Sequence, residues 1–247
     1  MTENQTTLAI VLKRQDYREN DSLVVFYTKE YGKQVLIARG TKKQSSKLAG
    51  HIEPLNLVNL MIVNGKGRNY VGGISSKQSF LDLKEDLNNL HWAFLGISWL
   101  IQLISVEGEA DERLFTLLNN YLTTLNQASS GDSKKEEGEL AFAVFSFRML
   151  AIIGYEPQTK NCLNCRQELK PEFNYFDLQN GGLLCPDCYN KNQQINIESY
   201  FKMSVASIQL LRFIFDNNQF LGKKATLSKK TAHEIAQVAL RFLQFRF

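Results

Sequence analysis

The hydrophobic residues between positions 8 and 80 occur in short runs that alternate with turns containing Asn, Asp or Gly. The last of these runs contains a pair of glycines, Gly72-Gly73, which predicts a β-bulge or a tight barrel corner. Five short strands without a helical pattern between them predict a small closed barrel. We expect the strands at residues 8–13, 22–28, 33–38, 55–63 and 70–75.

Beyond residue 80 the hydrophobic spacing changes to intervals of three and four, which predicts helices. A first helix is expected over residues 87–104 and a second over 114–125, followed by a polar loop at 128–138. Residues 140–153 are apolar on nearly every side, so this third helix should lie at the centre of the helical region.

Two more helices are expected near the C-terminus. Ser204 and Ser228 each precede an amphipathic run, and a serine at that position can accept a hydrogen bond from the first helical turn. Gly154 should end the preceding helix, and Pro157 should prevent it from continuing.

All four cysteines lie in two Cys-x-x-Cys pairs, Cys162 with Cys165 and Cys185 with Cys188. Two such pairs separated by about 15 to 20 residues are typical of a zinc site, since each pair directs two thiolates at one point. Two pairs fill the coordination sphere, so one structural Zn²⁺ per chain is expected. Disulfides, free thiols in a core and a redox pair are the alternatives. The polar N-terminus carries no secretory signal, which predicts a reducing cytoplasm and disfavours disulfides.

The segment between the cysteine pairs predicts a β-hairpin that turns at Asn180-Gly181. A chain of 247 residues is long enough for one large or two small domains. We therefore predict an α+β protein. A five-stranded barrel in residues 1–80 would be followed by an all-helical domain in residues 81–247, into which a zinc module at 158–192 is inserted.

The net charge of +4 is unevenly distributed along the chain. Residues 1–80 carry 12 Lys and Arg against 6 Asp and Glu, whereas residues 81–247 carry 17 against 19. A basic first third indicates a polyanionic partner, although a solvated lysine-rich surface has the same composition. No apolar stretch has transmembrane length, and no recognised catalytic motif occurs, so neither a membrane span nor an enzyme is predicted.

Cations and hydroxyl or amide side chains are concentrated in residues 39–47. Such cations neutralise phosphates, and the polar groups can hydrogen-bond phosphate oxygens. Four tyrosines could stack on bases or could pack inside the barrel, namely Tyr17, Tyr27, Tyr31 and Tyr70. The candidate DNA-binding residues are Arg14, Arg18, Arg39, Lys42, Lys43, Lys47, Lys66 and Arg68.

Several motifs occur together in a characteristic order. They are Tyr17-Arg18-Glu19-Asn20-Asp21, Ala38-Arg39-Gly40, Phe147-Arg148-Met149-Leu150, Gly154-Tyr155-Glu156-Pro157 and the cysteine pairs with Gly181-Gly182 between them. In this order the chain resembles the RecO recombination mediators of bacterial DNA repair. The resemblance covers most of the chain and includes all four of the family's zinc positions.

The resemblance implies an OB-fold for the barrel and a role in DNA repair and homologous recombination. Members bind single- and double-stranded DNA, anneal complementary strands and, with RecR and single-strand-binding protein, promote recombinase loading. It also implies a cytoplasmic, nucleoid-associated protein whose helical domain contacts the C-terminal tail of single-strand-binding protein. Arg148 is the candidate residue for that contact.

A second interpretation is an interaction scaffold, in which a zinc-stabilised helical domain and the barrel dock other proteins without direct DNA function. The mildly acidic balance of residues 81–247 motivates it.

Overall fold

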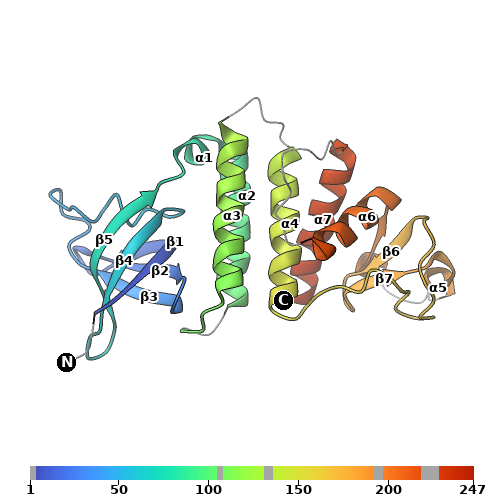
Figure 1. The fold of residues 1–247 in the computed structure, drawn as a ribbon, viewed down its shortest axis with the longest axis horizontal. Coiled ribbons are helices and arrows are strands. Elements are labelled where there is room, and N and C mark those ends of the chain that lie inside the picture. The colour runs from blue at the N-terminus through green and yellow to red at the C-terminus, as the bar shows by residue number, and fades with distance from the viewer. Residues whose placement is uncertain (1–3, 105–107, 131–135, 192–196, 218–227) are drawn as a thin grey trace. The chain divides into compact units, whose positions relative to one another are not determined.

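The computed structural model describes residues 4–104, 108–130, 136–191, 197–217 and 228–247 (Figure 1). These residues form two compact units. Unit 1 comprises Met1–Asp86 with Ile97–Gln127, and unit 2 comprises Leu87–Gly96 with Ala128–Phe247. No helix in the described part of the chain is long and apolar enough to cross a membrane.

Unit 1 contains a closed barrel of five strands in the order β1-β2-β3-β5-β4. Neighbouring strands run antiparallel, except where β3 meets β5 through a parallel pairing of Ile37 with Tyr70 that closes the barrel. The predicted barrel is therefore confirmed, with a first strand that extends further than expected. The strands are β1 (Gln5–Tyr17), β2 (Asp21–Thr28), β3 (Gly32–Ala38), β4 (Leu57–Val63) and β5 (Tyr70–Gln78).

The barrel interior is filled by apolar side chains from all five strands, with residues such as Phe26, Leu36 and Leu60 completely buried. The pairing of β4 with β5 shifts register beside Gly72, which confirms the predicted bulge. A Cβ atom at Gly72 would stand 2.4 Å from the side chain of Val63, so the bulge leaves no room for a side chain at this position.

The β2–β3 turn, at one end of the barrel, contacts the segment that leads into α3 (Glu112–Ser129). The amide of Gly108 donates to the carbonyl of Lys33 at 3.1 Å. The amide of Asp111 donates to the hydroxyl of Tyr27 at 3.3 Å. Tyr27 is 1% exposed, so it packs in the structure and offers no face to a base. Residues 108–112 therefore cover this end of the barrel.

Gly32→Ala should destabilise unit 1. Gly32 has φ +59°, and a Cβ atom there would come 1.9 Å from the carbonyl oxygen of Glu109. Backbone strain and the clash together should cost about 3 kcal/mol of unfolding free energy, measured by urea denaturation. Gly50→Ala is the control, because a Cβ atom at Gly50 meets nothing within 4 Å. Equal midpoints for the two variants would contradict the expectation.

Unit 2 is organised around α4 (Glu136–Ile152), whose residues Phe142, Phe145 and Phe147 are fully buried. This confirms the central position predicted from its uniformly apolar sequence. A small sheet in the order β7-β6-β8 packs nearby, with the Phe176 ring 6.5 Å from that of Phe147 and 5.2 Å from that of Phe242. The other elements of unit 2 are β6 (Asn174–Asp177), β7 (Gly182–Leu184), α5 (Pro186–Lys191), a 3-10 turn (Ile197–Ser199), β8 (Tyr200–Met203), α6 (Val205–Asp216) and α7 (Lys229–Arg246). The helix α1 (Leu81–Glu85) belongs to unit 1, and α2 (Leu87–Leu103) contributes residues to both units.

Both predicted helix caps are present. The Ser204 side chain accepts from the amide of Ser207 at 3.3 Å, and Ser228 accepts from the amide of Thr231 at 3.1 Å. Gly154 has φ +88° and lies two residues beyond the end of α4 at Ile152, as expected of a terminating glycine.

Several details differ from the expectation. The short helices α1 and α5 and the strand β8 were not predicted, because helices of five or six residues and a four-residue strand carry too little periodic signal. The expected loop at 128–138 is shortened on both sides, since α3 extends through Ser129 and α4 begins at Glu136. Residues 131–135 of that loop, and residue 192 of the zinc module, lie outside the described residues.

Candidate nucleic-acid interface and metal centre

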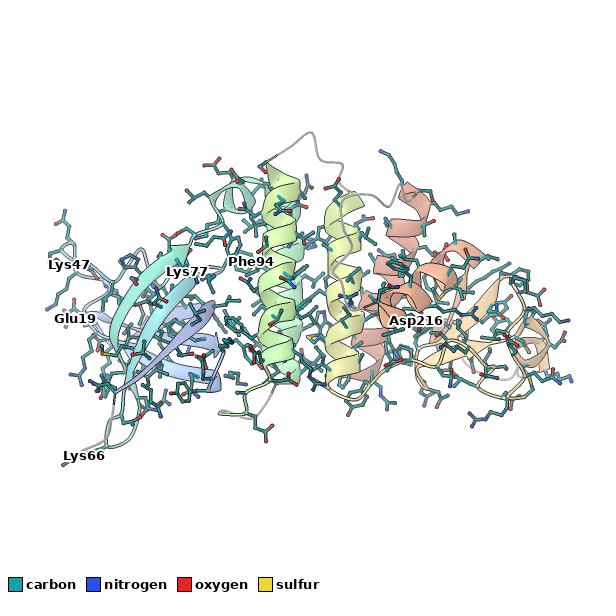
Figure 2. All side chains as sticks on the ribbon, viewed as in Figure 1. Glu19, Lys47, Lys66, Lys77, Phe94 and Asp216 are labelled. Carbon is teal, nitrogen blue, oxygen red and sulfur yellow. The ribbon has the colours of Figure 1, made fainter. Side chains whose placement is uncertain are left out.

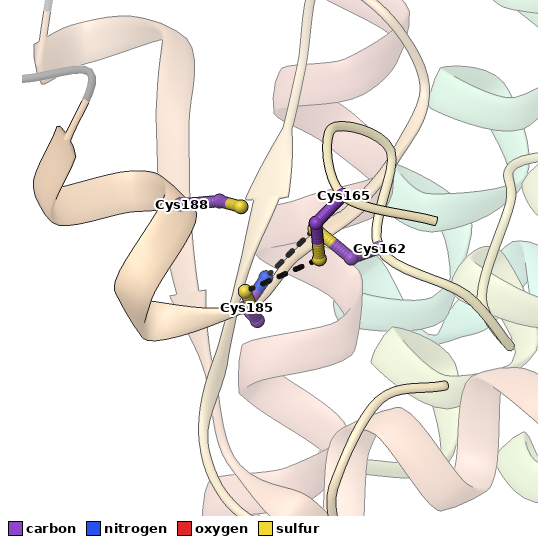
Figure 3. A group of neighbouring side chains, drawn as sticks. All are labelled: Cys162, Cys165, Cys185 and Cys188. Carbon is purple, nitrogen blue, oxygen red and sulfur yellow. Dashed lines mark hydrogen bonds between the residues drawn. The ribbon is translucent and has the colours of Figure 1, made fainter. Parts of the chain in front are cut away.

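The four cysteines form one cluster in unit 2, with their sulfur atoms all within 4.8 Å of one another. Cys162 and Cys165 lie on a loop, Cys185 follows β7 and Cys188 lies on α5 (Figure 3). The tight β6–β7 turn, in which Gly181 has φ +67°, leads the chain back so that the second pair meets the first.

The spacing of the sulfur atoms fits a tetrahedral ion. Thiolates at about 2.3 Å from a tetrahedral Zn²⁺ stand about 3.8 Å apart. The sulfur atoms of Cys165 and Cys185, which come from different pairs, are 4.0 Å apart. A cluster of four thiol groups at this separation can hold a metal ion without another ligand.

Backbone amides also support a negative sulfur in the cluster. The amide of Cys185 donates to the Cys162 sulfur at 3.4 Å (Figure 3). Burial alone would raise the pKa of the Cys162 thiol, but the amides of Cys185, Cys165 and Asn164 together lower that pKa to about 6. Burial and the neighbouring Cys162 raise the pKa of Cys185 to about 12. The backbone amides thus favour a thiolate at Cys162, which is the form in which a cysteine binds a metal ion.

Side-chain contacts hold the cluster in place. The rings of Tyr175 on β6 and Tyr189 on α5 stack at 3.6 Å, with an angle of 6° between their planes. The guanidinium of Arg212 on α6 donates to the carbonyl of Thr159 at 2.8 Å. Cys162 is 1% exposed, whereas Cys165 is exposed, so the cluster lies at the edge of unit 2.

The predicted DNA-binding residues all belong to unit 1, but they do not share one place. Arg18, Arg39 and Lys43 line a pocket of about 480 Å³ together with Glu19, Asn20, Asp21 and Gly40. The pocket lies between the β1–β2 turn and the segment after β3. It is therefore at the opposite end of β2 and β3 from the end that residues 108–112 cover.

The start of β5 also reaches this end of the barrel. The guanidinium carbon of Arg39 lies 4.0 Å from the centre of the Tyr70 ring, a cation–π contact that restricts the arginine. The guanidinium carbon of Arg18 likewise lies 5.1 Å from the centre of the Tyr17 ring. Tyr31, in contrast, packs against the barrel core. Positive charge and aromatic side chains therefore occur together at the end of the barrel opposite residues 108–112.

Two of the predicted cations have partners within unit 1. Arg14 donates to the Ser22 hydroxyl at 3.2 Å and to the Ala49 carbonyl at 3.3 Å. The Lys42 ammonium lies 3.0 Å from a carboxylate oxygen of Asp16. Both side chains thereby connect the loop after β3 to the β1–β2 hairpin. Their direct contact with DNA stays a prediction.

The other three predicted cations, Lys47, Lys66 and Arg68, are exposed and do not line the pocket. Lys47 and Lys66 project from two different loops of the barrel (Figure 2). Their roles in DNA binding also stay predictions.

Sequence reasoning missed the groups that shape the pocket. Ser22 and Thr41 are both buried, with their hydroxyl oxygens 2.8 Å apart. The amide of Lys42 donates to the carbonyl of Asn20 at 3.1 Å. Asn, Asp and Ser are common in turns, so Asn20-Asp21-Ser22 looks like an ordinary turn sequence. Nothing in it indicates that Asp21 and Ser22 bond to Gly40 and Thr41, about twenty residues further on.

The candidate partner residue Arg148 lies on α4 and contacts the end of α6. Its guanidinium donates to the carbonyl of Ile214 at 3.3 Å and to the carbonyl of Asn217. Burial lowers the pKa of this guanidinium. The side chain thus stabilises the helix C-terminus within unit 2, and its contact with another protein stays a prediction.

The barrel topology and the cysteine cluster together define the class of the protein: an OB-type barrel joined to a helical unit with four clustered cysteines that could hold a metal ion. Models of the Recombination protein O N-terminal and C-terminal regions match residues 1–80 and 84–247. The chain belongs to the RecO family.

Curated relatives agree with this assignment. A DNA repair protein RecO of Dehalococcoides mccartyi is 31% identical over 212 residues, which cover 86% of this chain and 78% of the relative. A DNA repair protein RecO of a Roseiflexus species is 30% identical over 96% of this chain and 79% of the relative. The Clostridium perfringens relative of the same name is 29% identical over 93% and 87%, respectively. Family membership gives the chain a role in DNA repair and recombination.

Proposed function

We propose that the chain is a non-enzymatic mediator that binds single- and double-stranded DNA and anneals complementary strands. The observation that carries the proposal is the pocket at the end of the barrel opposite residues 108–112. Arg18 from the β1–β2 turn lies there with Arg39 and Lys43 from the segment after β3. Cations gathered around one concave site suit a phosphate backbone, whereas solvated surface lysines are usually scattered.

Annealing needs two polyanions to approach each other, so a basic surface that neutralises phosphates would lower the repulsion between them. Residues 1–80 would supply this surface, with Arg18, Arg39 and Lys43 on the backbone and Lys47, Lys66 and Arg68 extending the contact. Arginine and aromatic side chains that lie together could also stack on exposed bases. Contacts to phosphates carry no direct sequence information, so such a surface would suit an annealing factor that acts on any sequence.

Residues 81–247 would hold the protein partners. We propose RecR and the C-terminal tail of single-strand-binding protein, through which the chain would promote recombinase loading at the nucleoid. Family membership supports recombination proteins as partners in general.

We further propose that Cys162, Cys165, Cys185 and Cys188 hold one Zn²⁺. Four thiolates and no oxygen ligand favour zinc over harder cations such as magnesium or calcium. With four protein ligands the ion has no open position for a substrate, so it would contribute stability and not catalysis.

The test is the binding of the full chain to a fluorescent single-stranded oligonucleotide, followed by annealing of complementary strands. Affinity should fall with salt, and the three pocket cations alone should contribute about −2 to the slope of log K against log salt. Annealing should be faster with the protein than without it, including when single-strand-binding protein coats the strands. An absence of binding in dilute buffer would contradict the proposal and favour the scaffold interpretation.

A further inference from the structure

Two carboxylates line the same pocket as the three cations. Glu19 lies in the β1–β2 turn and Asp21 is the first residue of β2, and each places one negative charge beside the site proposed for phosphate. Simple electrostatics predicts that both weaken the binding of an anion. The contacts of the two side chains, however, are different.

Asp21 holds the backbone of the opposite segment. Its Oδ1 atom accepts a hydrogen bond from the amide of Gly40 at 2.9 Å. Gly40 has φ +66°, a left-handed conformation at the point where the chain leaves β3 and turns into the loop. A charged acceptor on this amide stabilises the turn more than a neutral one would.

Two of the three pocket cations lie close to Gly40 in the sequence. Arg39 precedes it, and Lys43 follows three residues later, with the Lys43 amide donating to the Gly40 carbonyl at 3.3 Å. The conformation at Gly40 therefore sets where both cations lie relative to Arg18 across the pocket. Thr41 is anchored independently through Ser22, so the segment stays attached if the Asp21 contact is lost.

Glu19 has no comparable contact. It is exposed, and within the part of the chain that the structure describes its carboxylate forms no hydrogen bond or ion pair. Figure 2 shows it on the barrel with its side chain directed outward. Glu19 and Asp21 thus form a natural pair of the same charge in the same pocket, of which only one is tied to the loop.

We infer that the pocket is a subsite for a backbone phosphate and that Asp21 is its positioning residue, an acidic side chain that promotes the binding of an anion. The inference rests on the proposed function. Asp21 fixes the turn at Gly40, and the turn fixes Arg39 and Lys43 around one phosphate. The benefit of this preorganisation exceeds the repulsion between the carboxylate and the phosphate, because the carboxylate is already hydrogen-bonded.

The experiment compares Asp21→Ala, Asp21→Glu and Asp21→Asn with Glu19→Ala in the full chain, using oligothymidylate of about 20 nucleotides as the probe. Asp21→Ala should bind about 10-fold more weakly, with a salt slope shallower by about 1, because ordered phosphate contacts are lost. Asp21→Glu keeps the charge but displaces the acceptor, so it should also bind more weakly. Asp21→Asn keeps an oxygen at the same place and should restore the wild-type affinity or exceed it. Glu19→Ala removes a carboxylate that is not tied to the loop, so it should bind more tightly than the wild type.

The opposite pattern would overturn the inference. If charge alone matters, Asp21→Ala will bind more tightly than the wild type, as Asp21→Asn does, and Asp21→Glu will match the wild type. A purely structural role would lower the melting temperature and the active fraction in a stoichiometric titration, yet leave the salt slope of the active molecules unchanged. Wild-type protein that fails to bind the probe would instead refute the proposed function, so the two failures are distinguishable.

Discussion

Replacing Arg18, Arg39 and Lys43 together by glutamine should lower the affinity for single-stranded DNA by roughly 100-fold at low salt, since each phosphate contact contributes about 1 kcal/mol. These are the three predicted cations that line one pocket. The salt slope should also become shallower by about 2, because fewer counterions are released on binding. Fluorescence anisotropy at several salt concentrations measures both quantities.

The control is a triple variant that removes the same charge from unit 2. Lys170, Lys191 and Lys230 are exposed and can be changed to glutamine together. This variant should lose only the weak long-range attraction and keep the slope of the wild type. Equal losses in the two triple variants would indicate non-specific attraction by net charge and would refute the pocket as the principal contact.

Removing the metal should give the largest loss of stability. We expect a chelator, or Cys185→Ser, to lower the melting temperature by about 10 °C or more, which at this size corresponds to several kcal/mol. The reason is that a metal ion held by the cluster would join the loop carrying Cys162 and Cys165 to α5, and this connection is lost when the ion is removed. Differential scanning calorimetry and elemental analysis, with about one zinc per chain expected, provide the measurements.

Cys185→Ser treated with the chelator is the internal control. Its melting temperature should not fall further, because the site is already lost. A wild-type melting temperature that is unchanged after complete metal removal would show that the cysteines pack without needing an ion.

Features with local causes were predictable from the sequence. Ser204 and Ser228 could be identified as helix caps because the capping hydrogen bond joins residues three apart. The cysteine cluster was predictable because the geometry of each Cys-x-x-Cys turn is set within four residues. The bulge at Gly72 was marked by paired glycines within a strand pattern.

Features with non-local causes were not predictable. The sequence offered eight basic residues as DNA contacts, and only the fold distinguishes those that line the pocket from Arg14 and Lys42, which have partners of their own. Likewise, the sequence offered Arg148 only as a candidate contact with another protein, and the fold alone shows that its guanidinium donates to the carbonyls of Ile214 and Asn217. Partners at a sequence distance of 19 to 69 residues, such as Asp21 with Gly40 or Arg148 with Asn217, leave no periodic trace.

Because residues 108–112 contact one end of the barrel, we expect a fragment that stops at residue 80 to be less stable than the whole of unit 1. Such a fragment lacks the main-chain partner of the Tyr27 hydroxyl at Asp111 and the segment that packs on the turn at Gly32. In a chain made from its N-terminus, these contacts would form only after residue 112 has been added. A shortened protein made to test DNA binding should therefore retain α3. Otherwise, weak binding caused by an unstable barrel could be mistaken for a property of the binding surface.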